Sequence, residues 1–212
     1  MSSTSLTIAA LAAAVAGLLV AEWRQSRIGV WIMKPLASTL FIAIALQSGA
    51  LSSGFGQLIL LALVLSWFGD VFLIGERSAA FIAGLSAFLL AHVAFAAAFL
   101  TQPLEFVPMA YTGLLMAIVA RVVLCWLWPG LPPALRLPVI AYVLVIALMV
   151  AVAGGTISSH GLLLLAPAVV FAASDIFVAR ERFVQSSLVN RLWGLPLYYG
   201  AQLAFALGVS AA

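Results

Sequence analysis

Apolar runs as long as a bilayer-spanning helix leave this chain very few ways to fold. The chain has 212 residues, of which 66% are hydrophobic and 7% are charged, and its mean hydropathy is +1.27. Soluble domains do not have this composition, and a helix needs roughly 20 apolar residues to cross a bilayer. The runs are continuous rather than alternating, which argues against a β-barrel. We therefore predict an all-α integral membrane protein.

The apolar runs predict about eight transmembrane helices in one bundle. Short linkers rich in turn residues separate them, such as 48–54 and 129–133. No stretch is long enough to form a separate soluble domain, so we treat 1–212 as a single transmembrane helical domain. The predicted spans cover 5–22, 30–47, 57–75, 79–100, 107–128, 136–153, 161–179 and 191–210.

Basic residues are distributed unevenly among the linkers. Seven arginines fall in or beside alternate linkers, and the other linkers contain no Lys or Arg. The positive-inside rule then makes the arginine side cytoplasmic and leaves both termini outside, for example in the inner (cell) membrane of a bacterium. The net charge of +3 therefore reflects topology, and no nucleic-acid partner is expected. These arginines are Arg24, Arg27, Arg77, Arg136, Arg180, Arg182 and Arg191.

The chain contains two aspartates, and both lie inside predicted spans. Each follows a small residue, precedes an aliphatic residue and Phe, and is followed shortly by Glu-Arg: Asp70 before Glu76-Arg77, and Asp175 before Glu181-Arg182. A charge at membrane depth is costly, so it usually faces the protein interior or a wet cavity and marks function. The two carboxylates are therefore the first candidates for a functional site.

The matched aspartates belong to a wider internal similarity. Residues 84–95 align with residues 194–205, sharing a Gly-Leu start and an Ala-x-x-Ala-Phe end, with His92 opposite Gln202. Four helices in each half is an even number, so two repeats, 1–105 and 106–212, would run parallel about an axis along the membrane normal. Such an axis would place Asp70 and Asp175 symmetrically.

Further polar side chains fall at similar depths along the predicted helices. They predict a polar pocket that opens toward the cytoplasm, with the His side chain nearer its outer end. The alternative is structural: acids and bases in one layer can neutralise each other, long basic side chains can extend to the interface, and tyrosines are common there. The candidates are Lys34, Arg121, Tyr198 and Tyr199, together with His92 and Gln202.

Two carboxylates beside one cavity suit acid–base chemistry. A protonated acid can donate a proton while an ionised one activates water, and either aspartate can take either role. The sequence has no Gly-x-Ser-x-Gly or His-Glu-x-x-His motif, and its lone cysteine, Cys125, offers no disulfide or Cys metal cluster. We expect no metal and no cofactor, although a single metal held by Asp70, Asp175 and His92 is an open alternative.

Five short segments resemble the YhhN-like membrane proteins, which include the lysoplasmalogenases. The similarity runs in order from the second predicted span to the eighth and so covers most of the chain. One departure is Phe95, where the family usually has Tyr, and we give that position no catalytic role. The matching segments are Lys34-Pro35-Leu36, 69–73, 84–92, Ser174-Asp175 and 198–202.

The resemblance implies an ether hydrolase that cleaves the vinyl ether bond of a lysoplasmalogen with water. Its products would be a fatty aldehyde and glycerophospho-ethanolamine or -choline, with Asp70 and Asp175 as acid and base. Lys34 and Arg121 would hold the phosphate. The other binding side chains, which would orient water or the glycerol hydroxyl, are His92, Tyr198, Tyr199 and Gln202.

The competing class is a proton-coupled or lipid-binding membrane transporter that uses the same intramembrane acids. Two-fold repeats with acids near the membrane midplane are also typical of carriers. Against this, the chain is short and lacks a matched pair of Gly- or Pro-broken helices. A third alternative is hydrolysis of another ether or ester lipid. Turnover in detergent, where no gradient exists, separates an enzyme from a carrier.

Overall fold

The computed structural model describes residues 2–75 and 77–210, which form helices and connecting turns without a β-strand. Glu76, which the sequence pattern singled out, lies outside the described residues. The elements are α1 Ser3–Trp23, α2 Arg27–Gln47, α3 Gly54–Ile74, α4 Ser78–Leu100, α5 Phe106–Leu127, the 3₁₀ turn η1 Trp128–Gly130, α6 Pro133–Gly155, α7 Ile157–His160, α8 Leu165–Phe183 and α9 Leu188–Gly208. The all-α prediction is confirmed.

Serine side chains define where four of the long helices begin. Ser2, Ser26, Ser53 and Ser187 each accept a hydrogen bond from a backbone N–H in the first turn of α1, α2, α3 and α9. These bonds satisfy N–H groups that have no partner inside the helix. This is why α3 begins at Gly54, three residues before the apolar run from which its start was predicted.

The helix predicted at 161–179 is displaced along the chain. Gly161 has a φ of +57°, a left-handed conformation that ends α7, and α8 begins only at Leu165. At its other end α8 continues through the charged residues to Phe183. Apolar composition marks where a chain meets lipid, whereas helix boundaries follow backbone hydrogen bonds, so the two do not coincide here.

Among the described residues, six helices are long and apolar enough to cross a membrane, and these are α1 to α6, with η1 continuing α5. Helix α8 carries Asp175 and three charged residues in its last turn, and α9 carries Asn190, Arg191 and Gln202. These polar residues lower the hydropathy of α8 and α9. An integral membrane protein is supported, and the total of eight spans stays a prediction.

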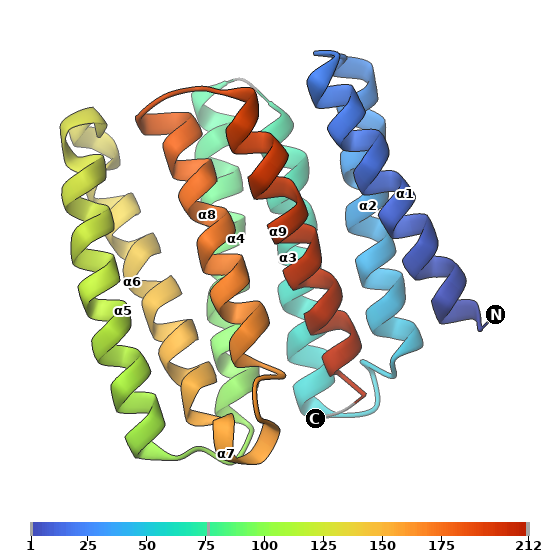
Figure 1. The fold of residues 1–212 in the computed structure, drawn as a ribbon, viewed down its shortest axis with the longest axis vertical. Helices are drawn as coiled ribbons and strands as arrows, with labels where there is room; N and C mark the ends of the chain where they lie inside the picture. Colours follow the sequence, from blue (N-terminus) through green and yellow to red (C-terminus); the bar gives the residue numbers. More distant parts are fainter. Residues whose placement is uncertain (1, 76, 211–212) are drawn as a thin grey trace.

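Four helices, two from each half of the chain, lie at the centre of the molecule. Figure 1 shows α3, α4, α8 and α9 between two outer pairs, α1 with α2 and α5 with α6. Helix α2 packs on α3 and α9, and α6 packs on α4 and α8. Both termini lie at the same end of the molecule (Figure 1), as the even number of spans predicted.

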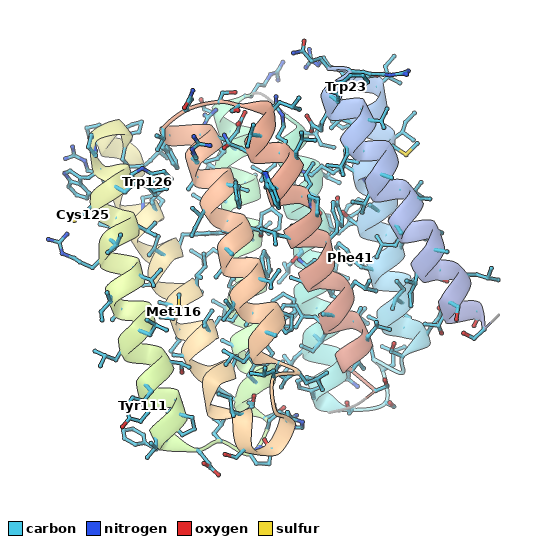
Figure 2. All side chains as sticks on the ribbon, in the orientation of Figure 1. Trp23, Phe41, Tyr111, Met116, Cys125 and Trp126 are labelled. Carbon is cyan, nitrogen blue, oxygen red and sulfur yellow. The ribbon has the colours of Figure 1, made fainter. Side chains whose placement is uncertain are left out.

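The core is aromatic, and the outer surface of the bundle is apolar. Phe95 stacks on Phe205 with ring centroids 4.3 Å apart, joining α4 to α9. On α5, by contrast, only Ala120 and Leu127 are buried. Figure 2 shows the side chains that this outer helix carries, and Tyr111 there is 72% exposed. Such a surface suits contact with lipid rather than water.

Glycines let α3 and α4 approach closely beside the first aspartate. A Cβ added at Gly69 would lie 2.6 Å from the ring of Phe88, and one at Gly84 would lie 2.7 Å from Leu73. Small residues of this kind allow membrane helices to pack backbone to backbone. The close packing positions Asp70, the next residue along α3, deep inside the bundle.

Candidate active site

Asp70 is almost completely buried on α3, with 2% of its surface exposed, and its carboxylate faces α2. Oδ1 lies 3.4 Å from Nζ of Lys34, and Oδ2 accepts a hydrogen bond of 2.6 Å from Oγ of Ser38. Residues four apart on a helix lie one turn apart on the same face. This spacing lets Lys34 and Ser38 approach the two oxygens of one carboxylate.

Two tyrosines of α9 complete the group. The hydroxyl of Tyr198 donates a 2.6 Å hydrogen bond to Oδ2 of Asp70. The hydroxyl of Tyr199 lies 3.3 Å from Oγ of Ser38 and 3.3 Å from the carbonyl oxygen of Lys34. Tyr198 therefore contacts the carboxylate directly, and Tyr199 contacts the residues that hold it. We call Lys34, Ser38, Asp70, Tyr198 and Tyr199 the Asp70 cluster.

The Asp70 cluster provides a cation and hydrogen-bond donors for a buried carboxylate. A buried charge is tolerated only when an opposite charge and hydrogen bonds replace the lost water. Asp70 has a cation beside one oxygen and two hydroxyl donors on the other. The side chain of Lys34 is itself only 13% exposed, so it needs this anion in turn. Each charge therefore stabilises the other.

Asp175 lies on α8 in different surroundings. Its Oδ2 accepts a 2.9 Å hydrogen bond from the hydroxyl of Tyr142 on α6, and lies 3.4 Å from Nε2 of His92 on α4. His92 is fully buried, whereas 12% of the Asp175 side chain is exposed. Within the described part of the chain, no Lys or Arg takes the place that Lys34 has beside Asp70. We call His92, Tyr142 and Asp175 the Asp175 cluster.

The two ring nitrogens of His92 have different surroundings. Nδ1 lies 2.7 Å from the carbonyl oxygen of Phe88, and a carbonyl oxygen only accepts, so Nδ1 carries a hydrogen. Nε2 lies 3.4 Å from Oδ2 of Asp175 and makes no hydrogen bond to the described residues. Asp175 is therefore the acidic side chain that Nε2 of His92 faces.

Aromatic rings separate and support the two clusters. The ring of Phe171 lies 4.4 Å from that of His92 and 5.5 Å from that of Tyr198, measured between centroids. Phe88 lies 5.7 Å from Tyr198 and 6.3 Å from Phe171. Aromatic packing of this kind fixes ring orientations. The two clusters therefore share one rigid wall.

A cavity of about 1050 Å³ lies in front of this wall, and side chains of both clusters line it. From the two clusters come Lys34, Asp70 and Tyr198, and Tyr142 and Asp175. Its apolar side is formed largely by α5, α6 and α8, including Leu115, Met116, Val139, Val143 and Val169. A mostly apolar cavity with a few convergent polar groups is the usual form of a ligand site, and this one can hold an alkyl chain.

The residues singled out from the sequence occupy three positions relative to this cavity. Four of them line it: Lys34, Asp70, Asp175 and Tyr198. Three lie buried behind its wall: His92, Tyr199 and Gln202. Gln202 is completely buried, and neither end of its amide makes a hydrogen bond of normal geometry to the described residues. The eighth residue, Arg121, lies elsewhere.

Arg121 lies apart from both the cavity and the wall behind it. It is exposed on α5, its guanidinium is directed to Sγ of Cys125 on the same helix, and it borders a separate shallow depression between α5 and α6. The sequence predicted its depth in the membrane but not the face of the helix on which it lies. Arg121 is therefore omitted from the site.

Two residues of the clusters escaped the sequence analysis. Ser38 lies one turn after Lys34, and Tyr142 is the only hydroxyl-bearing residue of α6. A search for polar residues on the same face as a known candidate would have found Ser38. Tyr142 was detectable as an isolated polar residue within an apolar helix. Within residues 2–75 and 77–210, no group of three His, Cys, Asp or Glu side chains is close enough to hold a metal ion.

The chain is similar to known proteins over most of its length. The model of the YhhN family matches residues 29–209. Lysoplasmalogenase TMEM86A of Bos taurus is 31% identical over 161 residues, which are 70% of this chain and 63% of that protein. Human lysoplasmalogenase TMEM86B is 35% identical over 160 residues, 74% of this chain and 65% of that protein.

A bacterial relative shows a similar level of identity. The lysoplasmalogenase of Mycobacterium tuberculosis is 36% identical over 152 residues, which are 65% of this chain and 53% of that protein. The matched region thus spans less than two thirds of each of these relatives. No solved structure matches the chain significantly.

Proposed function

The chain belongs to the YhhN family, and from that premise we propose that it is a lysoplasmalogenase, which hydrolyses the vinyl ether bond of a lysoplasmalogen. A proton adds to the outer carbon of the vinyl ether and leaves an oxocarbenium ion. Water adds to this cation and loses a proton, and the resulting hemiacetal collapses. The products are a fatty aldehyde and a glycerophospho-base, and one water molecule is consumed.

The observation that carries the proposal is a pair of carboxyl groups that line one cavity and have different neighbours. Asp70 lies beside Lys34 and accepts hydrogen bonds from two hydroxyl groups. Asp175 lies beside His92 and accepts one hydrogen bond from Tyr142. A reaction that needs a proton donor and a stabiliser of positive charge is served by such a pair. The cavity that both groups line also has room for an alkyl chain.

In this scheme Asp175 is the general acid. It delivers its proton to the vinyl carbon, and His92 supplies the next proton from behind the cavity wall. Tyr142 donates to Oδ2 of Asp175 and orients the carboxyl group. General acids in enzymes contribute about 10²- to 10⁴-fold to rate. Because His92 does not line the cavity, it acts through Asp175 as a positioning residue.

Asp70 takes the complementary role. Its negative charge stabilises the oxocarbenium ion, and it accepts the proton that the attacking water releases. Tyr198 and Ser38 hold the oxygen Oδ2, and Lys34 holds Oδ1, so the carboxylate is preorganised before the charge develops. Tyr199 secures Ser38 and the backbone of α2. Gln202 sits one turn beyond Tyr198 and supports that wall.

We also propose eight transmembrane spans arranged as two parallel repeats of one domain, with both termini outside and the cavity opening toward the cytoplasm. Two observations support the repeats. Each aspartate is approached by the second helix of its own half and by the last helix of the other half. Gly84 and Gly194 are aligned in the sequence, and each packs against a residue that follows an aspartate. Gly84 lies beside Leu73, three residues after Asp70, and Gly194 lies beside Phe177, two residues after Asp175. Arginine-rich linkers at one end support the orientation.

The decisive experiment is aldehyde release from lysoplasmenyl-ethanolamine by the purified protein in detergent. Release by the wild type and its loss in Asp70→Asn and Asp175→Asn proteins that still fold supports the proposal. Turnover without a membrane gradient also distinguishes the enzyme from a carrier. If both variants release aldehyde at the wild-type rate, the proposed roles of the aspartates are wrong.

A further inference from the structure

Charged and polar side chains line the cavity beside the α1–α2 turn and the α8–α9 turn. We call five of them the pocket entrance: Glu22, Arg27, Glu181, Asn190 and Arg191. They line the same cavity as Asp70 and Asp175 but lie at the ends of their helices. They have no role in the chemistry proposed above.

Arg191 joins the two acids of this entrance. Its Nε lies 3.1 Å from Oε2 of Glu22 on α1, and its Nη1 lies 2.8 Å from Oε1 of Glu181 on α8. The Arg191 side chain is 34% exposed, so solvent or a ligand can reach it. The two ion pairs orient its guanidinium, and its Nη2 has no partner among the described residues. A guanidinium oriented in this way is suited to bind phosphate oxygens.

The two glutamates differ in what they can still bind. Both oxygens of Glu181 are fully engaged, because Oε1 accepts from Ser186 and Arg191 and Oε2 accepts from Asn190 and the backbone N–H of Ser187. Glu22 has Arg191 as its one ion-pair partner in the described chain, through Oε2. Its Oε1 makes no ion pair among the described residues and is open to a cation, and Lys34 is a second cation whose charge acts on Glu22.

The distance from this entrance to the aspartates matches one lipid. Arg191 and Tyr198 are seven residues apart on α9, a rise of about 10 Å along the helix axis. In a lysoplasmalogen, seven bonds separate the phosphorus from the outer vinyl carbon, an extended length of about 9 Å from standard bond lengths. A phosphate beside Arg191 thus brings the vinyl ether to Tyr198 and Asp70.

We propose that Arg191 and Glu22 form the headgroup subsite of the enzyme. Arg191 binds the phosphate through its free donors, and Glu22 binds the ammonium of a zwitterionic phosphobase. Glu181 and Asn190 hold Arg191 in place. This inference rests on the proposed function, because it specifies which part of the substrate the entrance recognises. Arg191 thus takes the phosphate-binding role that the sequence suggested for Arg121.

Three substrates with the same vinyl ether test the subsite: 1-alkenyl-glycerophosphoethanolamine, 1-alkenylglycerol 3-phosphate and 1-alkenylglycerol, at one mole fraction in detergent. Arg191→Gln is expected to raise KM about tenfold or more for the two phosphate-bearing substrates and to leave 1-alkenylglycerol within about twofold. Glu22→Gln is expected to raise KM for the ethanolamine substrate alone. Arg24→Gln, an exposed arginine of the same turn that does not line the cavity, is the control.

The alternative is that Arg191 only ties α1, α8 and α9 together. A purely structural tether predicts an equal loss on all three substrates in Arg191→Gln, and that result would overturn the subsite. Equal kcat/KM of the wild type on all three substrates would overturn it as well, while leaving vinyl ether hydrolysis intact. Aldehyde release from none of the three would refute the proposed function and the subsite together. Competition by glycerophosphoethanolamine but not by inorganic phosphate would support recognition of the ammonium as well as the phosphate by the subsite.

Discussion

Asp70 and Asp175 hold corresponding places in the two halves of the chain, yet their neighbours differ in charge. Asp70 is paired with a lysine and two hydroxyl donors, whereas Asp175 is paired with a histidine and one hydroxyl. A lysine brings a fixed positive charge, and a histidine brings a proton that can move. Two acids with similar local sequences therefore have different partners, because different helices pack against them.

The largest effect is expected at Asp175, the proposed general acid. Asp175→Asn should lower kcat by about 1000-fold, because an amide has no proton to give to the vinyl carbon. Its folding stability should change little, because His92 can remain neutral when no carboxylate faces it. Single-turnover aldehyde release and unfolding in detergent measure the two effects. A large loss of stability in Asp175→Asn would contradict the expected difference between this variant and Asp70→Asn.

Asp70→Asn should lower both activity and stability. It leaves Lys34 buried without its anion, and removing one partner of a buried ion pair costs about 3 to 5 kcal/mol. The double variant Asp70→Asn with Lys34→Met should recover much of this stability but none of the activity. Chemical unfolding of the three proteins in one detergent tests the point. Equal stability of Asp70→Asn and Asp175→Asn would show that the two carboxylates are not held differently.

Removal of single hydroxyl groups should give smaller and unequal effects. Tyr198→Phe removes a donor to Asp70, the proposed stabiliser of positive charge, and should lower kcat/KM about tenfold, because hydrogen bonds to charged groups contribute about 1.5 to 3 kcal/mol. Tyr142→Phe removes a donor to Asp175, the proposed general acid, and we expect about a threefold decrease. Steady-state kinetics on one substrate compares them. A larger decrease for Tyr142→Phe than for Tyr198→Phe would indicate that the two aspartates have the opposite roles.

The smallest effect is expected outside both clusters. Arg121→Gln should leave kcat and KM within about twofold of the wild type, because Arg121 is exposed on α5 and does not line the cavity. Lys34→Gln, assayed beside it, should lower activity strongly, since Lys34 contacts Asp70 directly. A rise in KM for Arg121→Gln would indicate that Arg121 does contribute to phosphate binding.

The candidate site was visible in the sequence only where a residue type is rare for its surroundings. Acids, a lysine and a histidine are conspicuous in apolar runs, and six of the eight residues predicted from the sequence lie within the two clusters. Ser38 and Tyr142 were missed because serine and tyrosine are common in membrane helices and carry no charge. Arg121 was misplaced because depth in a helix does not specify the face.

Residue composition alone determined that the chain is helical and suited to a membrane, because each polar backbone group within lipid must be satisfied inside its own segment. It also singled out the two carboxylates, whose burial is too costly to be accidental. The exact ends of α3 and α8, the partners of each aspartate and the shared cavity required the tertiary structure. Those features depend on which faces of α2, α4, α6 and α9 meet, and contacts between distant segments leave no local trace in the order of residues.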